Sequence, residues 1–285
     1  MKSPFNTAIV GLGHVGSIMQ ELFPKSYIYD EPKGIGLNRD TVNSCKYVFV
    51  CVPTPMIEDP NTYGKCDTSI VQDVLGWLSK DAIIILRSTV PIGFTQYYID
   101  DGYNIVFQPE YYGETPNHPF ANPHNRNWIT LGGKPEVTKK VAELYHSIYT
   151  SDITIHCVDD ARVAELAKYM ENCFYATKVT FCNEFYSIAE SFGLNYEQVR
   201  ETWLLDPRIN SSHTFVYPDN RGYGGSCLPK DTAAMIYQAK TQLDRDVPLL
   251  SAVVESNRYY VGRSCDDTGY FAIADNNTGD LFYDS

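Results

Sequence analysis

A cysteine near the end of the chain stands in a sequence that could support nucleophilic chemistry. Residues 224–231 read Gly-Gly-Ser-Cys-Leu-Pro-Lys-Asp, so that Cys227 follows two glycines and precedes Asp231 by four positions. The glycines let a ligand approach the thiol, Pro229 stiffens the loop, and the Asp231 carboxylate can hold a water molecule or a hydroxyl group. The pattern predicts a nucleophile at Cys227. Taken alone, it also fits a structural turn that contains a buried, unreactive cysteine.

The N-terminus carries a second chemical signal, a glycine fingerprint for a dinucleotide. An apolar stretch leads into Gly-Leu-Gly-His-Val-Gly at residues 11–16, and a helical pattern follows to about Phe23. Gly11 permits the tight turn, Gly13 lets the backbone approach a pyrophosphate, and Gly16 lets the helix pack on the strand. Free N–H groups at the start of the helix attract the phosphate groups.

An acidic residue ends the next short strand, Tyr-Ile-Tyr-Asp. This residue, Asp30, follows the first glycine at about the ~20 residues typical of dinucleotide folds. Its carboxylate can accept hydrogen bonds from the adenosine ribose and would repel a 2′-phosphate group. The order of strand, fingerprint, helix, strand and acid therefore predicts a site for NAD rather than NADP.

The composition excludes several classes of partner. The 285 residues carry a net charge of −12, which argues against a nucleic-acid partner. The eight cysteines lack the paired spacing of a zinc site and the density of a disulfide scaffold. No signal peptide precedes the first strand, and no apolar run approaches the ~18 residues of a membrane span. We therefore expect a cytoplasmic protein with no metal site and no membrane contact.

Short apolar runs after the second strand predict further buried strands. They occupy residues 46–52, 82–87 and 104–108, with 128–131 and 153–156 as further candidates. Their separation by polar or helical stretches predicts an α/β fold with a Rossmann-type doubly wound parallel sheet.

Polar residues and prolines follow three of these strands. The segments are Val-Pro-Thr-Pro at 52–55, Ser-Thr-Val-Pro at 88–91 and Gln-Pro-Glu at 108–110. A single proline simply ends a strand. Because ligands bind beyond the carboxyl ends of the strands in such sheets, three of these segments together predict the rim of a site.

A long helical pattern begins near Asp159 and runs without glycine or proline to Phe192, where Gly193 stops it. At ~1.5 Å per residue this helix would be near 50 Å long and would form a domain spine or a dimer seam. Lys168 and Asn172 lie four positions apart, on one face of it. A solvated polar stripe is the simpler explanation of such a pair.

Further helical patterns predict that an all-α domain, built on this long central helix, follows the Rossmann domain. They lie at residues 196–204, 231–241 and 248–261. We expect an NAD-binding Rossmann domain over 1–158, a helical central and dimerisation domain with the cysteine loop over 159–262, and a short tail over 263–285.

A series of motifs, in order, resembles the UDP-glucose/GDP-mannose dehydrogenase family over roughly residues 5–260. The motifs are Gly-Leu-Gly-His-Val-Gly, Val-Pro-Thr-Pro, Ser-Thr-Val-Pro, Gln-Pro-Glu-Tyr-Tyr-Gly-Glu-Thr, Glu-Leu-Ala-Lys-Tyr-Met-Glu-Asn, Asn-Glu at 183–184 and the Cys227 loop. Members of this family oxidise the C6 hydroxymethyl group of a nucleotide sugar to a carboxylate, with two NAD and a cysteine thioester. The resemblance implies an NAD-dependent oxidoreductase, a nucleotide-sugar substrate such as UDP-glucose, and a homodimer formed through the 159–192 helix.

The resemblance also implies roles for individual residues. Lys168 and Asn172 donate to the alcohol oxygen, Glu110 is the hydrolytic base, and Thr89 and Asp231 hold water or support the lysine. The catalytic set is Cys227, Lys168, Asn172, Glu110, Thr89 and Asp231. The cofactor-binding set is Gly11, Gly13, His14, Val15, Gly16, Asp30, Val52, Pro53, Thr54, Ser88, Thr89 and Glu114. The substrate-binding set is Glu110, Tyr111, Tyr112, Glu114, Lys168, Asn172, Arg208 and Gly224.

The chain departs from the family pattern in several places. We expect it to lack the third, Rossmann-like domain that holds much of the nucleotide in family members. Gln108 replaces the usual asparagine, and Thr115 replaces the usual glycine. Arg208 matches a family arginine that reaches the substrate of the neighbouring subunit, and a surface ion pair explains it equally well.

Three functions remain open from the sequence. The first is oxidation of a nucleotide sugar, UDP-glucose or GDP-mannose. The second is oxidation of a smaller hydroxy acid, as in the β-hydroxyacid dehydrogenases, which share this domain arrangement but have no need of the Cys227 motif. The third is an NAD-binding remnant without catalysis, against which the retention of every implied chemical residue argues.

Overall fold

The computed structural model describes residues 6–57, 59, 62–112, 122–149 and 153–264. The chain divides into two compact units at Lys168, and the segment Met56–Cys66 belongs to the second unit. The domain boundaries expected from the sequence, 158/159 and 262/263, stay a prediction.

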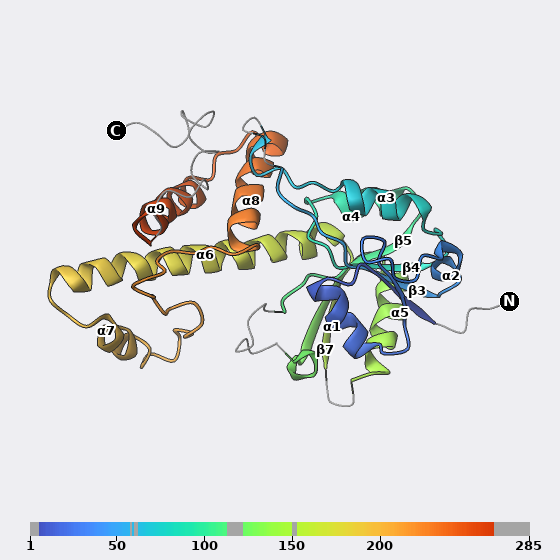
Figure 1. The fold of residues 1–285 in the computed structure, drawn as a ribbon, viewed down its shortest axis with the longest axis horizontal. Helices are drawn as coiled ribbons and strands as arrows, with labels where there is room; N and C mark the ends of the chain where they lie inside the picture. Colours follow the sequence, from blue (N-terminus) through green and yellow to red (C-terminus); the bar gives the residue numbers. More distant parts are fainter. Residues whose placement is uncertain (1–5, 58, 60–61, 113–121, 150–152, 265–285) are drawn as a thin grey trace. The chain divides into compact units, whose positions relative to one another are not determined.

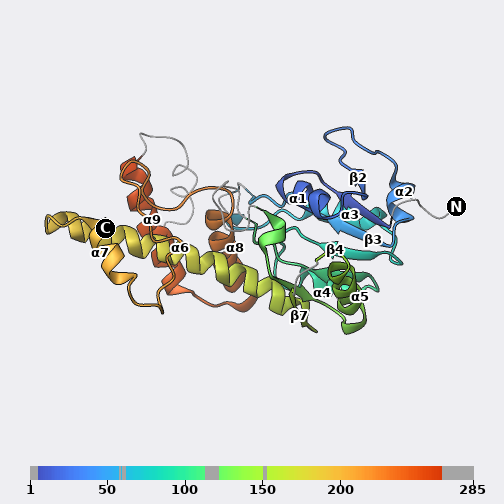
Figure 2. The same cartoon turned by 90° about the horizontal axis from the view of Figure 1, so that it is seen from below.

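A seven-stranded sheet forms the centre of the first unit, in the order β2-β1-β3-β4-β5-β6-β7. The strands are β1 (Thr7–Val10), β2 (Tyr27–Tyr29), β3 (Tyr47–Val50), β4 (Ile83–Leu86), β5 (Asn104–Phe107), β6 (Trp128–Gly132) and β7 (Thr154–Val158). The first five strands are parallel. Figure 2 shows β2 and β7 toward opposite edges of this sheet. The sheet confirms the predicted Rossmann-type α/β fold.

The last two strands of the sheet run against the others. β6 is antiparallel to β5 and meets it through one residue pair, Phe107 with Gly132, whereas β7 is parallel to β6. The described part of the β5–β6 connection contains only the short 3₁₀ turn Pro123–Asn125. A parallel neighbour usually requires a crossover through an α-helix, and the described part of this connection contains none. The sheet is therefore mostly rather than fully parallel.

Helices cover both faces of the sheet. They are α1 (His14–Leu22), α2 (Arg39–Asn43), α3 (Ser69–Trp77), α4 (Phe94–Asp100) and α5 (Pro135–His146). Figure 1 shows α3 and α4 over one face, with α1 and α5 over the other. This double cover explains the continuous apolar runs, since a strand buried on both faces needs an apolar side chain at every position.

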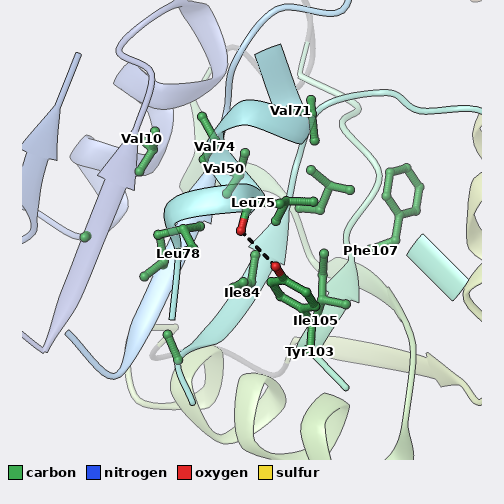
Figure 3. Close-up of a cluster of buried hydrophobic side chains, with 14 of the residues drawn as sticks. Val10, Val50, Val71, Val74, Leu75, Leu78, Ile84, Tyr103, Ile105 and Phe107 are labelled. Atoms are coloured by element: carbon green, nitrogen blue, oxygen red, sulfur yellow. Dashed lines mark hydrogen bonds between the residues drawn. The ribbon is translucent and has the colours of Figure 1, made fainter. Parts of the chain in front are cut away.

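Two buried clusters fill the spaces between the sheet and its helices. Alternate residues of one strand enter different clusters, because successive side chains point to opposite faces. Ile84 therefore packs with Leu75 of α3, while Ile85 packs in the cluster that contains Met19 of α1. Figure 3 shows the first cluster, in which the Tyr103 hydroxyl donates to the Leu75 carbonyl at 3.0 Å. Each buried Leu or Ile contributes about 1.5–3 kcal/mol.

The long helix α6 (Ala161–Ser191) confirms the predicted central helix. Its 31 residues give it a length of about 46 Å. Gly193 takes a φ of +66°, and the Leu194 N–H donates to the Ala189 carbonyl at 2.9 Å. This is the Schellman arrangement, in which a glycine in the left-handed conformation ends a helix.

Three further helices follow α6 in the second unit. They are α7 (Tyr196–Trp203), α8 (Leu228–Leu243) and α9 (Pro248–Ser264). α8 begins three residues earlier than the sequence pattern indicated. Pro229 therefore lies in the first turn of a helix rather than in a loop, a position where proline loses no hydrogen bond. No described helix combines the length and the apolar character that a bilayer crossing requires.

Candidate active site

The glycine turn of the first unit has room for a phosphate group at one position. Gly11 has a φ of +89°, and a Cβ atom there would lie 2.8 Å from the Cys51 carbonyl oxygen. A Cβ atom at Gly16 would lie 1.9 Å from the Gly11 oxygen. At Gly13, which precedes α1, a Cβ atom would meet nothing within 4 Å. Gly11 and Gly16 are therefore needed for the turn itself, and Gly13 leaves open space before the helix N-terminus.

Asp30 is fixed beside this turn. It is 8% exposed, and its Oδ2 accepts from the Leu12 N–H at 2.7 Å while Oδ1 accepts from the Lys33 N–H at 2.9 Å. Each carboxylate oxygen keeps a lone pair for a ribose hydroxyl. The Lys33 ammonium donates to the Leu12 carbonyl at 2.5 Å, which places a cation at the turn. Sequence reasoning missed Lys33, whose only signal is its spacing of three from the acid.

The loops after β3 and β4 are joined to each other. The Ser88 hydroxyl donates to the Val52 carbonyl at 2.6 Å, and the Thr54 hydroxyl donates to the Thr89 carbonyl at 2.7 Å. The structure therefore brings together four of the predicted cofactor residues at the carboxyl edge of the sheet. Pro53 lies between two of them in the chain.

Glu165, in the first turns of α6, binds the start of α4. Its Oε2 accepts from the Gly93 N–H at 2.6 Å, and its Oε1 accepts from the Thr95 N–H at 2.9 Å. The residue is fully buried. Burial raises the pKa of Glu165, while the two N–H groups act in the opposite direction. Sequence reasoning gave this residue no role.

Glu110, the predicted hydrolytic base, forms an ion pair with the buried Arg87 guanidinium. Glu110 also accepts from the Tyr112 N–H, and Arg87 donates to the Gln108 and Pro109 carbonyl groups at 3.2 Å each. Burial lowers the pKa of Arg87, but the Glu110 charge outweighs it and the net shift is upward. The signal that sequence reasoning missed was a charged residue at the end of an Ile-Ile-Ile-Leu strand, which needs a buried partner.

The two predicted substrate tyrosines have different surroundings. The Tyr111 ring centre lies 4.8 Å from the Lys168 ammonium and 4.9 Å from the Arg126 guanidinium carbon. Both distances are within the range of cation–π attraction. Tyr112 is 7% exposed and packs in the second hydrophobic cluster. Tyr111 is therefore the tyrosine whose ring lies beside the predicted donor Lys168, whereas Tyr112 contacts the predicted base Glu110 through its backbone N–H.

The Cys227 thiol is exposed in the second unit. Cys227 precedes the first residue of α8, and its carbonyl group accepts from the Asp231 N–H at 2.9 Å. The Asp231 carboxylate, 1% exposed, accepts from Asn172 Nδ2 at 2.5 Å and from Lys230 Nζ at 2.6 Å. Burial lowers the pKa of Lys230, and the Asp231 charge reverses this to a net rise. Lys230, which sequence reasoning missed, compensates the buried carboxylate.

The loop before Cys227 is held by two asparagines. Arg221 donates through Nε to Asn183 Oδ1 at 2.7 Å and through Nη2 to the Asn183 carbonyl at 2.8 Å. Asn257 accepts from the Tyr223 N–H at 2.7 Å and donates to the Tyr223 carbonyl at 2.9 Å. Asn183 lies on α6 and Asn257 on α9, so two helices fix this loop.

Glycines complete the loop. A Cβ atom at Gly222 would lie 2.6 Å from Asn257 Oδ1, whereas at Gly224 it would meet nothing within 4 Å. Gly224, a predicted substrate residue three positions before Cys227, therefore has open space where a side chain would lie. Sequence reasoning found the glycines but not Arg221 or the role of Asn183.

The remaining predicted residues lie elsewhere or outside the described part of the chain. Arg208, on the loop after α7, has a side chain that is 86% exposed and pairs with Asp206 at 2.5 Å. Glu114 lies outside the described residues, as does the chain from residue 265 onward. Among the described residues, no group of three or more His, Cys, Asp or Glu side chains could hold a metal ion.

Two family models match the chain. The NAD-binding domain of the UDP-glucose/GDP-mannose dehydrogenase family matches residues 37–151, and the central domain of the same family matches residues 162–259. NAD is accordingly the cofactor of the first unit. The described residues fit it, because Gly13 has open space before a helix N-terminus and Asp30 has oxygen atoms free to accept from a ribose.

Curated relatives extend the likeness but are longer. The putative UDP-glucose 6-dehydrogenase YtcA of Bacillus subtilis (strain 168) is 32% identical over 238 residues, which cover 79% of this chain and 53% of the relative. The GDP-mannose 6-dehydrogenase of Pseudomonas syringae pv. tomato is 27% identical over 267 residues, which cover 87% of this chain and 58% of the relative. The chain spans about half the length of these relatives.

Solved structures share the fold. A UDP-glucose dehydrogenase from Pyrobaculum islandicum superposes with a TM-score of 0.74 at 23% identity, covering 90% of this chain and 69% of that one. A 3-hydroxyisobutyrate dehydrogenase from Mycobacterium tuberculosis superposes with a TM-score of 0.66 at 15% identity, covering 95% of this chain and 98% of that one. At these identities the likeness shows the fold alone.

Proposed function

Because the chain belongs to the UDP-glucose/GDP-mannose dehydrogenase family, we propose that it oxidises the C6 hydroxyl group of a nucleotide sugar to a carboxylate. In this reaction one alcohol, two NAD⁺ and one water give a carboxylate, two NADH and three protons. The observation that carries the proposal is the exposed Cys227 thiol one turn from a buried Asp231, which is itself held by Asn172 and Lys230.

The first oxidation needs groups that stabilise the developing alkoxide. Bound NAD would accept one hydride in each of the two oxidations. Asn172 uses one Nδ2 hydrogen on Asp231 and keeps a second for the substrate oxygen. Lys168, held beside the Tyr111 ring, is the second donor, and the alcohol proton leaves to solvent or a base.

The second oxidation passes through Cys227. Its thiolate attacks the aldehyde carbon to form a thiohemiacetal, and loss of hydride from that carbon gives a thioester. The start of α8 supplies free N–H groups and the Lys230 ammonium supplies positive charge near the sulfur. The accessible position of Cys227 suits this attack better than any of the buried cysteines would.

Water then hydrolyses the thioester, with the sulfur as leaving group. Glu110 is the proposed base, and Thr89 the proposed water ligand. The Arg87 ion pair and the Tyr112 N–H hold the Glu110 carboxylate in one orientation, and each of its oxygens keeps a lone pair that can accept a proton.

UDP-glucose is the proposed sugar, with GDP-mannose as the alternative. Curated relatives of both kinds match this chain over more than three-quarters of its length. A hydroxy-acid substrate is the other candidate, since the 3-hydroxyisobutyrate dehydrogenase shares the fold. The cysteine loop argues against it, because oxidation of a secondary or primary alcohol to a carbonyl requires no thioester.

A second copy of the chain is the proposed partner, bound along α6. Large apolar side chains on this helix, and that of Phe192 directly after it, are 42% to 76% exposed. They are Val163, Leu166, Met170, Phe174, Phe181, Phe185, Ile188 and Phe192. Their spacing of mostly three, four or seven residues forms an apolar stripe suited to helix packing. We also infer a cytoplasmic location, which the free state of all described cysteines supports.

The test is NADH formation by the purified chain with NAD and UDP-glucose, GDP-mannose or 3-hydroxyisobutyrate, beside the Cys227→Ala variant. We expect two NADH per molecule of one nucleotide sugar, and none from the variant after any first turnover. One NADH from the hydroxy acid, undiminished in the variant, would replace this proposal by the alternative.

A further inference from the structure

The carboxylate of Glu165 is fully buried, at a position where an apolar side chain would lose less hydration free energy. Moving a charge out of water is unfavourable unless hydrogen bonds replace the lost hydration. Here both oxygens accept a backbone N–H, from Gly93 at 2.6 Å and from Thr95 at 2.9 Å. These are N–H groups at the start of α4, where a negative charge is favoured. The carboxylate therefore acts as a clamp between α6 and the start of α4.

This clamp belongs to a chain of contacts that reaches the predicted cofactor loops. The loop that precedes Gly93 begins at Ser88, whose hydroxyl donates to the Val52 carbonyl. The carbonyl of the following residue, Thr89, accepts from the Thr54 hydroxyl. Glu165 thus fixes one end of the loop over residues 88–93, and the loop after β3 fixes the other. Lys168 lies one turn further along α6, so the same helix carries the clamp and the proposed donor.

The order of the strands separates the two halves of the cofactor. Asp30 follows β2, and the clamped loop follows β4, three strand spacings away in the sheet. At ~4.8 Å per spacing this is about 14 Å. If Gly13 and Asp30 hold the adenosine half of NAD, that half would be distant from the loop that Glu165 fixes, and the nicotinamide half would lie toward this loop.

We propose that Glu165 is a positioning residue, which holds the loop over residues 88–93 in the arrangement that receives the nicotinamide half of NAD. The inference rests on the proposed assignment of Val52, Thr54, Ser88 and Thr89 to the cofactor. It does not depend on which substrate is oxidised.

The test compares two ligands on the purified full chain. NADH contains the nicotinamide ring and ADP-ribose lacks it, and calorimetry or NADH fluorescence gives each dissociation constant. Glu165→Gln leaves one acceptor oxygen, so one of the two N–H groups loses its partner. We expect NADH binding to weaken about tenfold, as for the loss of a hydrogen bond to a charged group, and ADP-ribose binding to stay within about twofold. Glu184→Gln, at an exposed glutamate on the same helix, is the matched control and leaves both constants unchanged.

Equal weakening of both ligands, or a lower unfolding temperature with both constants unchanged, would show a merely structural role and overturn the proposal. If Glu165→Gln does not fold, Glu165→Asp keeps the charge but is too short for both bonds, and the same comparison applies. A chain that shows the expected ligand pattern but oxidises no nucleotide sugar would refute the proposed function and leave the role of Glu165 intact.

Discussion

The glycine turn and the cysteine loop are both short glycine motifs, but they are held in place differently. At the turn, most contacts are local: the Gly16 position faces the Gly11 oxygen and Asp30 accepts from the Leu12 N–H 18 residues away, while Gly11 also faces the Cys51 carbonyl at the end of a neighbouring strand. The cysteine loop depends on Asn183 and Asn257, 38 and 34 residues from their partners, and on Asn172, 59 residues from Asp231. The first site is a local structure, and the second is an assembled one.

This difference predicts how each site fails. A local site loses function when its own backbone is obstructed, whereas an assembled site loses stability when one buried partner is removed.

The largest effect is expected for Cys227→Ala. Removal of the nucleophile should lower carboxylate formation by about 10⁴-fold or more, because no other group can form the thioester. Since the thiol is exposed, urea unfolding should give the same midpoint as the wild type. A variant that still forms the acid at a comparable rate would exclude the thioester route.

The ion pair between Asp231 and Lys230 should contribute more to the free energy of unfolding than an exposed ion pair does. Asp231→Asn removes the charge that compensates Lys230, and the loss of one partner of a buried pair costs about 3–5 kcal/mol of unfolding free energy. The matched control is Asp206→Asn, which breaks the exposed pair with Arg208 and should leave the urea midpoint unchanged. Equal effects of the two variants would contradict the assembled character of the cysteine site.

Most of the fold was predictable from the sequence because its signals are local. The Ile-Ile-Ile-Leu run predicts a strand buried on both faces, and the absence of glycine and proline predicts α6. The direction of β6 was not predictable, since it depends on one residue pair and the connection before it. The sequence pattern places the start of α8 three residues too late, because a proline fits a loop as well as it fits the first turn of a helix, where Pro229 lies.

The candidate site was predictable in part. Residues within a motif, such as Gly13 and Cys227, were found from spacing alone. Arg87, Lys230 and Arg221 were missed because each is defined by a partner, respectively Glu110, Asp231 and Asn183, whose proximity only the folded chain shows. Their common signal is a charged residue in a segment that must be buried, which indicates that a partner exists but not which one.

Two glycine variants separate the structural from the binding role of the turn. Gly16→Ala forces a Cβ atom to 1.9 Å from the Gly11 oxygen, and such overpacking should cost about 1–3 kcal/mol of unfolding free energy. Gly13→Ala places its Cβ atom in open space, so the unfolding free energy should stay within about 0.5 kcal/mol while NADH affinity falls. Urea titration and NADH fluorescence measure the two effects. If Gly13→Ala binds NADH like the wild type, the pyrophosphate does not lie at this turn.

The smallest effect is expected at the edge of the local site. The Lys33 ammonium, bonded to the Leu12 carbonyl, adds one exposed cation beside the proposed pyrophosphate position. Lys33→Met should raise the NADH dissociation constant about threefold at low salt, as for a surface charge, and the difference should shrink as salt screens the attraction. Lys25→Met, at another exposed lysine of the same unit, should change neither the constant nor its salt dependence. A salt-independent loss at Lys33 would instead mean that the lysine holds the backbone of the turn, because the Leu12 bond would then matter more than the charge.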